Sequence, residues 1–105
     1  MNKNSSGSSV VVALRLAEEQ ACAGYLTART AMVRWAARAV SLGRLAAEQP
    51  QRGDYRQAWT AAVSAHTDAT VRTQTAWQLW QDAQLRTDAA WTATAGRAAP
   101  HPAAA

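Results

Sequence analysis

The chain has 105 residues, a formal net charge of +4 and a hydrophobic fraction of 49%, much of it alanine, with no phenylalanine. A chain this short forms one small domain at most, and its own core would be thin. The lone cysteine, Cys22, excludes an internal disulfide, and two histidines without a Cys/His spacing exclude a structural zinc site.

Residues 1–8 are rich in Ser, Asn and Gly and are predicted to be a disordered tail. The apolar run that follows, from Val10 to Ala17, is interrupted by Arg15 and is too short to span a bilayer. We therefore expect no signal peptide, no membrane helix and no membrane partner. The expected location is cytoplasmic.

Residues 9–48 have the apolar spacing of an amphipathic helix and are predicted to form the first helix of an all-α protein. One face has a heptad-like spacing that suits a helix–helix seam. That face consists of Leu14, Ala21, Tyr25, Ala28, Met32, Trp35, Ala39, Leu42 and Ala46. Gly24 and Gly43 each weaken a helix by about 1 kcal/mol relative to Ala, so the first helix can bend or break near Gly24 or Gly43.

The helical pattern is interrupted at residues 49–55, which read QPQRGDY. Pro50 disfavours helix at the residue before it, and Gly53 permits a left-handed turn. Asp54, with Gln57 three residues later, resembles a capping box at the start of another helix. These signals predict an antiparallel two-helix hairpin, which is a small helical bundle.

The second helix is predicted over residues 54–95, so that residues 9–96 form a single helical domain, with a disordered tail over 97–105. Its aromatic side chains fall inside an arc of about 60°, which also holds His66, Thr73 and Gln84. These aromatics are Tyr55, Trp59, Trp77, Trp80 and Trp91. Aromatics aligned in this way are more often core than a stacking surface for single-stranded nucleic acid, so we predict that they are buried. Trp91, near the end of the helix, is the expected exception and a candidate contact to another subunit.

The whole net charge lies in residues 20–47, which contain four arginines and no acid. Arg34, Arg38 and Arg44 project within about 120° of one another, with Thr and Ser hydroxyls between them. Guanidinium groups and hydroxyls commonly contact phosphates. We therefore predict binding to the backbone phosphates of RNA or DNA without sequence specificity, while a merely solvated face is the alternative. The predicted nucleic-acid-binding residues are Arg29, Arg34, Arg38 and Arg44, with Arg52 and Arg56 at the turn.

Residues suited to catalysis are few, and no catalytic, cofactor-binding or metal-binding residue is predicted. Glu18 and Glu19 face different directions, and no Glu-x-x-His motif is present. His66 has no nearby carboxylate on its own face, and Cys22 has no histidine nearby in the sequence. We therefore expect a protein that is not an enzyme and uses no cofactor.

The predicted hairpin resembles the secreted WXG100 family in length and architecture. The Trp-x-Gly of that family is replaced at the turn by the residues QRGD, numbers 51–54. Its trailing Tyr-x-x-x-acid signal is also absent, because Arg29 follows Tyr25 and Trp59 follows Tyr55 at that spacing.

Residues 10–95 resemble the helical small subunit of CRISPR effector complexes, which is short, all-helical, rich in Ala and Arg and without catalytic residues. This resemblance implies a ribonucleoprotein complex in which several copies stack beside larger protein subunits, with arginines on the phosphates of a strand. The predicted function is thus a non-catalytic accessory subunit of a nucleoprotein assembly. The alternative is a protein-interaction module, either WXG100-like or a dimeric four-helix bundle, with no role in binding nucleic acid.

Overall fold

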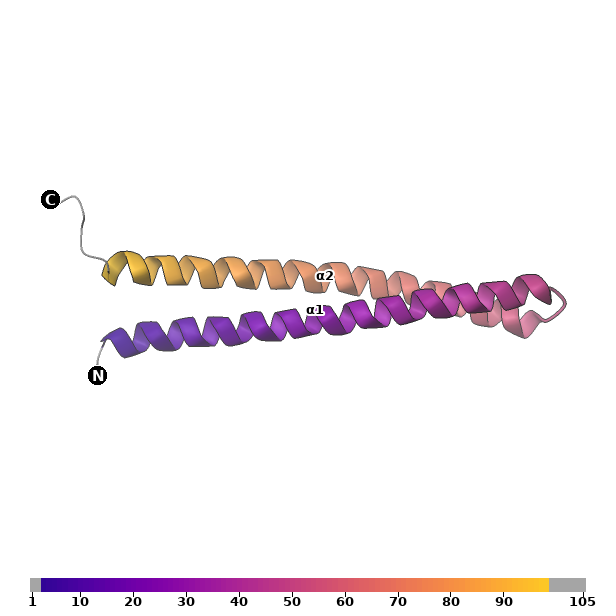
Figure 1. The fold of residues 1–105 in the computed structure, drawn as a ribbon, viewed down its shortest axis with the longest axis horizontal. Helices are drawn as coiled ribbons and strands as arrows, with labels where there is room; N and C mark the ends of the chain where they lie inside the picture. Colours follow the sequence, from indigo (N-terminus) through magenta and orange to yellow (C-terminus); the bar gives the residue numbers. More distant parts are fainter. Residues whose placement is uncertain (1–2, 99–105) are drawn as a thin grey trace.

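The computed structural model describes residues 3–98, and residues 1–2 and 99–105 lie outside the described part. The described residues form two helices, α1 (Lys3–Glu48) and α2 (Gly53–Ala98), and contain no strand. The helices run antiparallel and pack against each other, so that both ends of the chain lie at one end of the hairpin (Figure 1). The predicted all-α hairpin is confirmed.

Both helices extend beyond the predicted ranges of 9–48 and 54–95. Residues 3–8, predicted as part of a disordered tail, form the start of α1, and α2 continues to Ala98. Adding a residue to an existing helix costs far less than nucleating one, so a helix extends until a strong breaker stops it. The remainder of the two predicted tails lies outside the described residues.

Helix α1 is continuous through both of its interior glycines, so the break that these glycines permit does not occur. A penalty of about 1 kcal/mol per glycine is too small to interrupt a long helix that is packed along its length. The two positions differ in their surroundings. A Cβ added at Gly43 would lie 2.9 Å from Nε1 of Trp59, whereas a Cβ at Gly24 would meet nothing within 4 Å. Gly43 therefore lets the Trp59 ring lie against the backbone of α1.

The connection between the helices is short and hydrogen-bonded. The backbone N–H of Gln49 donates to the carbonyl of Leu45 at 2.9 Å, and that of Arg52 donates to the carbonyl of Gln49 at 3.0 Å. Gly53 is the first residue of α2, and none of the described residues has a positive φ. The left-handed turn that Gly53 permits is therefore not formed, and the chain turns at Pro50 with the two backbone hydrogen bonds instead.

The α2 side of the helix–helix seam is built from small side chains. Its buried residues are Ala62, Ala69, Thr73, Ala83 and Thr87, with exposed fractions of 1–9%. Thr87 Oγ1 donates to the carbonyl of Ala83 at 3.0 Å and also reaches the carbonyl of Leu14 on the other helix at 3.3 Å. This contact marks the register of the two helices. Residues whose numbers add to about 101, as those of Leu14 and Thr87 do, face each other across the seam.

The predicted seam face of α1 does lie against α2. Every member of that face is half-buried except Trp35, which is 37% exposed. The heptad-like spacing of the face is therefore confirmed as the packing surface. The large side chains of this face, such as Leu14, Met32 and Leu42, pack against the small residues of α2.

The prediction that the aromatic stripe of α2 is buried is wrong for Trp59 and Trp77. Trp59, Trp77 and Trp91 are 41%, 44% and 61% exposed, and only Tyr55 and Trp80 are half-buried. In a hairpin each helix has a single neighbour, so it can bury only a narrow stripe, and the small residues occupy that stripe. The exposure expected for Trp91 is confirmed.

Three aromatic rings do contact one another across the hairpin. The ring centroids of Tyr25 and Trp77 lie 5.3 Å apart, those of Tyr25 and Trp80 lie 5.6 Å apart, and those of the two tryptophans lie 5.5 Å apart. Aromatic pairs at such distances contribute about 0.5–1.5 kcal/mol beyond the area that they bury. This cluster joins the middle of α1 to α2 from one side of the seam.

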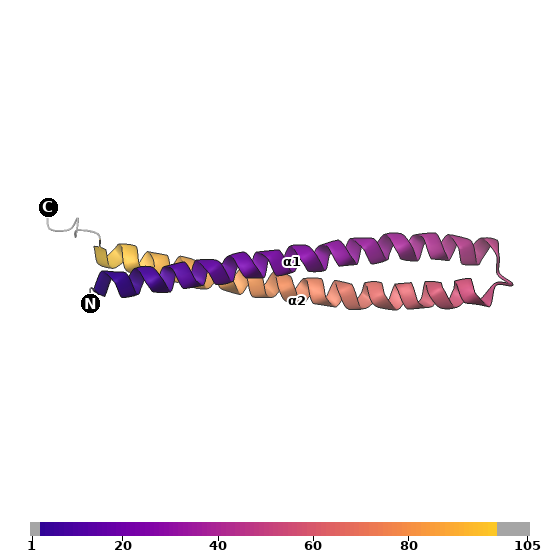
Figure 2. The same ribbon diagram turned by 90° about the horizontal axis from the view of Figure 1, so that it is seen from below.

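The hairpin is a rod and not a globule. Its extents are 81 × 31 × 13 Å and its radius of gyration is 23.3 Å, against about 13 Å for a compact chain of this length. The helices also wind around each other. Figure 1 shows them side by side near the chain ends and overlapping near the turn, and Figure 2 shows the reverse. A sustained heptad spacing produces this supercoiling.

The two interior glycines of α1 should respond differently to the same substitution. Gly24→Ala should raise the free energy of unfolding by up to about 1 kcal/mol, because Ala has the higher helix propensity and the added methyl meets nothing. Gly43→Ala should give a smaller gain or a loss, because the Trp59 ring must move. Denaturant melts at one protein concentration measure both, and equal gains would show that the ring does not rest on Gly43.

Candidate functional site

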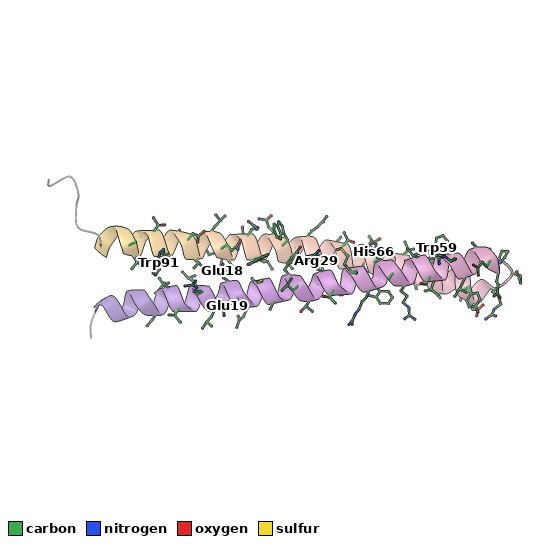
Figure 3. The ribbon with its side chains drawn as sticks, viewed as in Figure 1. Glu18, Glu19, Arg29, Trp59, His66 and Trp91 are labelled. Carbon is green, nitrogen blue, oxygen red and sulfur yellow. The ribbon has the colours of Figure 1, made fainter. Side chains whose placement is uncertain are left out.

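The six arginines predicted to bind nucleic acid are all exposed, but they do not form one surface. Arg29, Arg34, Arg38 and Arg44 lie along α1, and Arg52 and Arg56 lie at the turn. By the helical rotation of 100° per residue, Arg29 and Arg38 lie on opposite flanks of α1. Figure 3 labels Arg29 near the middle of the hairpin.

The two arginines at the turn make contacts within the chain. Arg52 forms a bidentate pair with Asp54, with Nε donating to Oδ1 at 2.9 Å and Nη2 donating to Oδ2 at 2.7 Å. The Arg52 guanidinium also lies 4.3 Å from the centre of the Tyr55 ring. Arg56 Nη2 donates to the carbonyl of Pro50 at 3.3 Å. These contacts brace the turn, so we assign both arginines a structural role.

The Arg52–Asp54 pair shifts the titration of both groups. The hydrogen bond from Arg52 is the main cause that lowers the pKa of Asp54 below its ordinary value of 3.8; burial opposes it, and the positive charge of Arg52 adds a smaller lowering effect. The hydrogen bond to Asp54 and the negative charge of that carboxylate raise the pKa of Arg52. Both groups are exposed to solvent, so the pair acts locally and is weakened by salt.

The turn should lose stability in acid through this pair. Because the pKa of Asp54 is lowered on folding, its contribution to stability is present above pH 3.8 and is lost as the pH falls through the lowered pKa. We expect Asp54→Asn to lower the free energy of unfolding at about pH 5 and to have a smaller effect at about pH 2. Chemical denaturation at both pH values measures this difference, and an equal effect at both would contradict it.

The four α1 arginines have no carboxylate partner in the described part of the chain. The ion pair that this part contains is Arg52–Asp54, at 2.7 Å. Arg29, Arg34, Arg38 and Arg44 therefore carry positive charge that no acidic side chain of residues 3–98 neutralises. This agrees with the absence of Asp and Glu from residues 20–47.

Two of these arginines share a shallow groove with a tryptophan. The groove has a volume of about 740 Å³ and is lined by Leu26, Thr27, Thr30, Ala31, Arg34, Trp35 and Arg38. The Arg38 guanidinium lies 6.0 Å from the centre of the Trp35 ring. Trp35 and Ala31 also line a neighbouring groove of about 580 Å³ that crosses to Asp68 and Arg72 of α2. Arg29 and Arg44 line neither groove. The arrangement offers cationic groups, hydroxyls and an indole to an anion that has an apolar part.

Three carboxylates and the cysteine line one groove of about 590 Å³, to which α1 contributes Glu18, Glu19 and Cys22 and α2 contributes Asp88. Glu18 is half-buried at the seam and Glu19 is exposed, and both are labelled in Figure 3. Cys22 is half-buried in this groove, which Trp80 also lines. Among residues 3–98, no group of three or more His, Cys, Asp and Glu side chains is placed to hold a metal ion. Neither helix, over the described residues, is long and apolar enough to cross a membrane.

The outer face of α1 carries a second apolar stripe, which was not predicted from the sequence. Its members recur at intervals of four and three residues, as in a second heptad seam, and we call it the outer α1 stripe. It consists of Val12, Leu16, Glu19, Ala23, Leu26, Thr30, Val33, Ala37, Val40, Arg44 and Ala47. Its Val and Leu side chains are 51–62% exposed, since the stripe faces away from α2. A search for a second heptad register in the sequence would have found it.

Comparison with known proteins does not identify the function of this chain. No family model, no curated protein and no solved structure matches the chain. The resemblances to the WXG100 family and to the CRISPR small subunit therefore stay predictions.

Proposed function

We propose that this chain is a non-catalytic helical assembly subunit that docks helices of partner proteins on the outward apolar faces of its hairpin. The proposal rests on the area that the chain exposes. Its accessible surface is 8049 Å² for a mass of 11.2 kDa, whereas a compact monomer of that mass exposes about 5,700 Å². The difference, about 2,300 Å², is surface that a partner can cover.

Much of this exposed surface is apolar and occurs on both helices. On α1 it forms the outer α1 stripe, and on α2 it includes Val63, Val71, Trp77, Leu85 and Trp91. Large exposed apolar patches on small proteins mark interaction sites, and tryptophan is enriched at such interfaces. The buried residues of the hairpin are Ala and Thr, which alone give a weak core. Association would therefore add much of the hydrophobic stabilisation that the hairpin lacks.

Purification of the chain from its source cells tests this proposal. We expect it in a species heavier than its own 11.2 kDa. The double substitution Leu26→Lys and Val33→Lys should release a single folded chain, because two charges in an apolar interface are costly to desolvate. Ser64→Lys with Gln74→Lys adds the same charge beside the apolar face of α2, so comparison of the two double variants shows which of the two faces holds the species together. Recovery of the wild type as a single chain would overturn the proposal.

A second candidate function is contact with the backbone phosphates of RNA or DNA, as an accessory subunit beside larger proteins in a nucleoprotein assembly. Two observations favour it. The four α1 arginines have no carboxylate partner within residues 3–98, and Arg34 and Arg38 share a groove with Trp35. Arginine forks suit phosphate oxygens, and an indole can stack on a base. Arg52 and Arg56 are left out of this surface because their contacts lie within the turn.

A salt series on two charge-reversed variants tests the second candidate. Arg34→Glu with Arg38→Glu should abolish binding to RNA or DNA without changing helicity, because both side chains are exposed. Arg15→Glu with Arg86→Glu gives the same change in net charge on exposed positions outside residues 20–47 and should retain most of the binding. Wild-type affinity should fall steeply with log salt, with a slope of about 0.7–0.9 per phosphate contact. Absence of binding by the wild type at low salt would eliminate this candidate.

A further inference from the structure

We infer that a second copy of this chain covers the outer α1 stripe, in an antiparallel contact between the α1 helices of the two copies. The inference rests on the proposed function and names the partner for one of its apolar faces. The inference follows from the order of side chains along the stripe. When two copies of the stripe run antiparallel, opposite charges face each other and large side chains face alanines.

Charge gives the first sign of this complementarity. The stripe contains one acid, Glu19, and one base, Arg44. In an antiparallel pair of identical helices, facing residues have numbers with a constant sum. If that sum is 63 (19 plus 44), each Glu19 faces the Arg44 of the other copy, and the two-fold symmetry makes this contact twice.

Side-chain size gives a second, independent sign in the same register. A sum of 63 also pairs Leu16 with Ala47, Ala23 with Val40, Leu26 with Ala37 and Thr30 with Val33. Three of these four layers combine a large apolar side chain with an alanine, which is the alternation that lets facing helices interdigitate. The nearest registers that keep the stripes in contact differ by one heptad. One of them places Arg44 against Leu26, and the other places Glu19 against Ala37, so neither forms the ion pair.

Both charged groups are free to make this contact. Glu19 and Arg44 form no ion pair in the described part of the chain, although Arg15 lies four residues before Glu19 and Glu48 lies four residues after Arg44. The stripe is also long enough for an extended contact, because the paired layers run from Leu16 to Ala47, about 45 Å of helix, and the Val and Leu side chains of the stripe are 51–62% exposed.

The contact would leave the remaining surfaces open. The outer α1 stripe lies on the side of α1 away from α2, so the two α2 helices are the outermost helices of the dimer. Trp77 and Trp91 then stay available to further partners. Arg29 and Arg34 lie at equal distances from the two-fold axis, which passes between residues 31 and 32. They flank the stripe without belonging to it, so the dimer gathers positive charge beside the axis without burying it.

Charge reversal with rescue tests the register on the full chain purified alone. Sedimentation equilibrium should give a mass of about twice 11.2 kDa for the wild type. Glu19→Arg and Arg44→Glu should each raise the dissociation constant of the dimer by about tenfold or more, because each converts two attractive contacts into two repulsive ones. The double variant should restore the wild-type value. Asp68→Arg and Arg86→Glu, which make the same charge changes on exposed positions of α2, should have little effect.

A disulfide test does not depend on charge. In a Cys22→Ala background, Thr30→Cys with Val33→Cys should give a covalent dimer on oxidation, since these positions face each other when the sum is 63. The same background with Thr67→Cys and Thr70→Cys, on α2, should not. Circular dichroism on every variant separates loss of contact from loss of helix.

Several results would overturn the inference. These are a wild type that stays monomeric at about 100 µM, a dimer or larger oligomer that is indifferent to both charge reversals, and a double variant no better than the single ones. A monomeric isolated chain that is still recovered from its source cells in a heavier species sensitive to Leu26→Lys and Val33→Lys would refute the homodimer alone. The proposed function would then stand with a different partner.

Discussion

The packing of small side chains along one face of α2 determines most of what this molecule presents to its surroundings. Ala62, Ala69 and Ala83 are buried at the seam with two threonines, and Thr87 reaches a backbone carbonyl of the facing helix. Small residues let two helix backbones come close together, but they bury little apolar area. The hairpin is therefore held by many weak contacts along its length, reinforced by the Tyr25–Trp77–Trp80 ring cluster and by the braced turn.

Apart from half-buried residues of the α1 seam face such as Leu14, Met32 and Leu42, many large apolar side chains are consequently placed at the edges of the seam or on the outer faces. A third helix packed on the hairpin would bury them, and the described residues contain no such helix. This is the physical basis for a subunit that completes its core by association. The outer α1 stripe and the exposed tryptophans of α2 occupy different sides of the rod, so the molecule can contact more than one partner at once.

The arginines divide into two groups by their contacts. Arg52 and Arg56 contact a carboxylate and a carbonyl at the turn, so Asp54 offsets the charge of Arg52 whereas Arg56 keeps its charge. Arg34 and Arg38 keep their charge beside Trp35, while Arg44 lies within the outer α1 stripe. The same α1 segment can thus contribute one arginine to a protein contact and others to an anion. The two proposed roles nevertheless share Leu26 and Thr30, which belong to the outer α1 stripe and also line the groove of Arg34 and Arg38, so a partner on the stripe and a nucleic acid in the groove compete for this part of α1.

The sequence by itself determined the all-α hairpin, the position of its turn and the face of α1 that meets α2, because these follow from local spacing and from Pro50. It also located the positive charge, since an acid-free segment is visible without a structure. Tertiary structure decided which side chains are buried. Trp59 and Trp77 share a helical face with Trp80, yet a single neighbouring helix covers only a narrow stripe, so spacing alone could not reveal that alanines fill it. Tertiary structure likewise decided the role of Arg52, because its bidentate bond to Asp54 depends on how the chain turns between the helices.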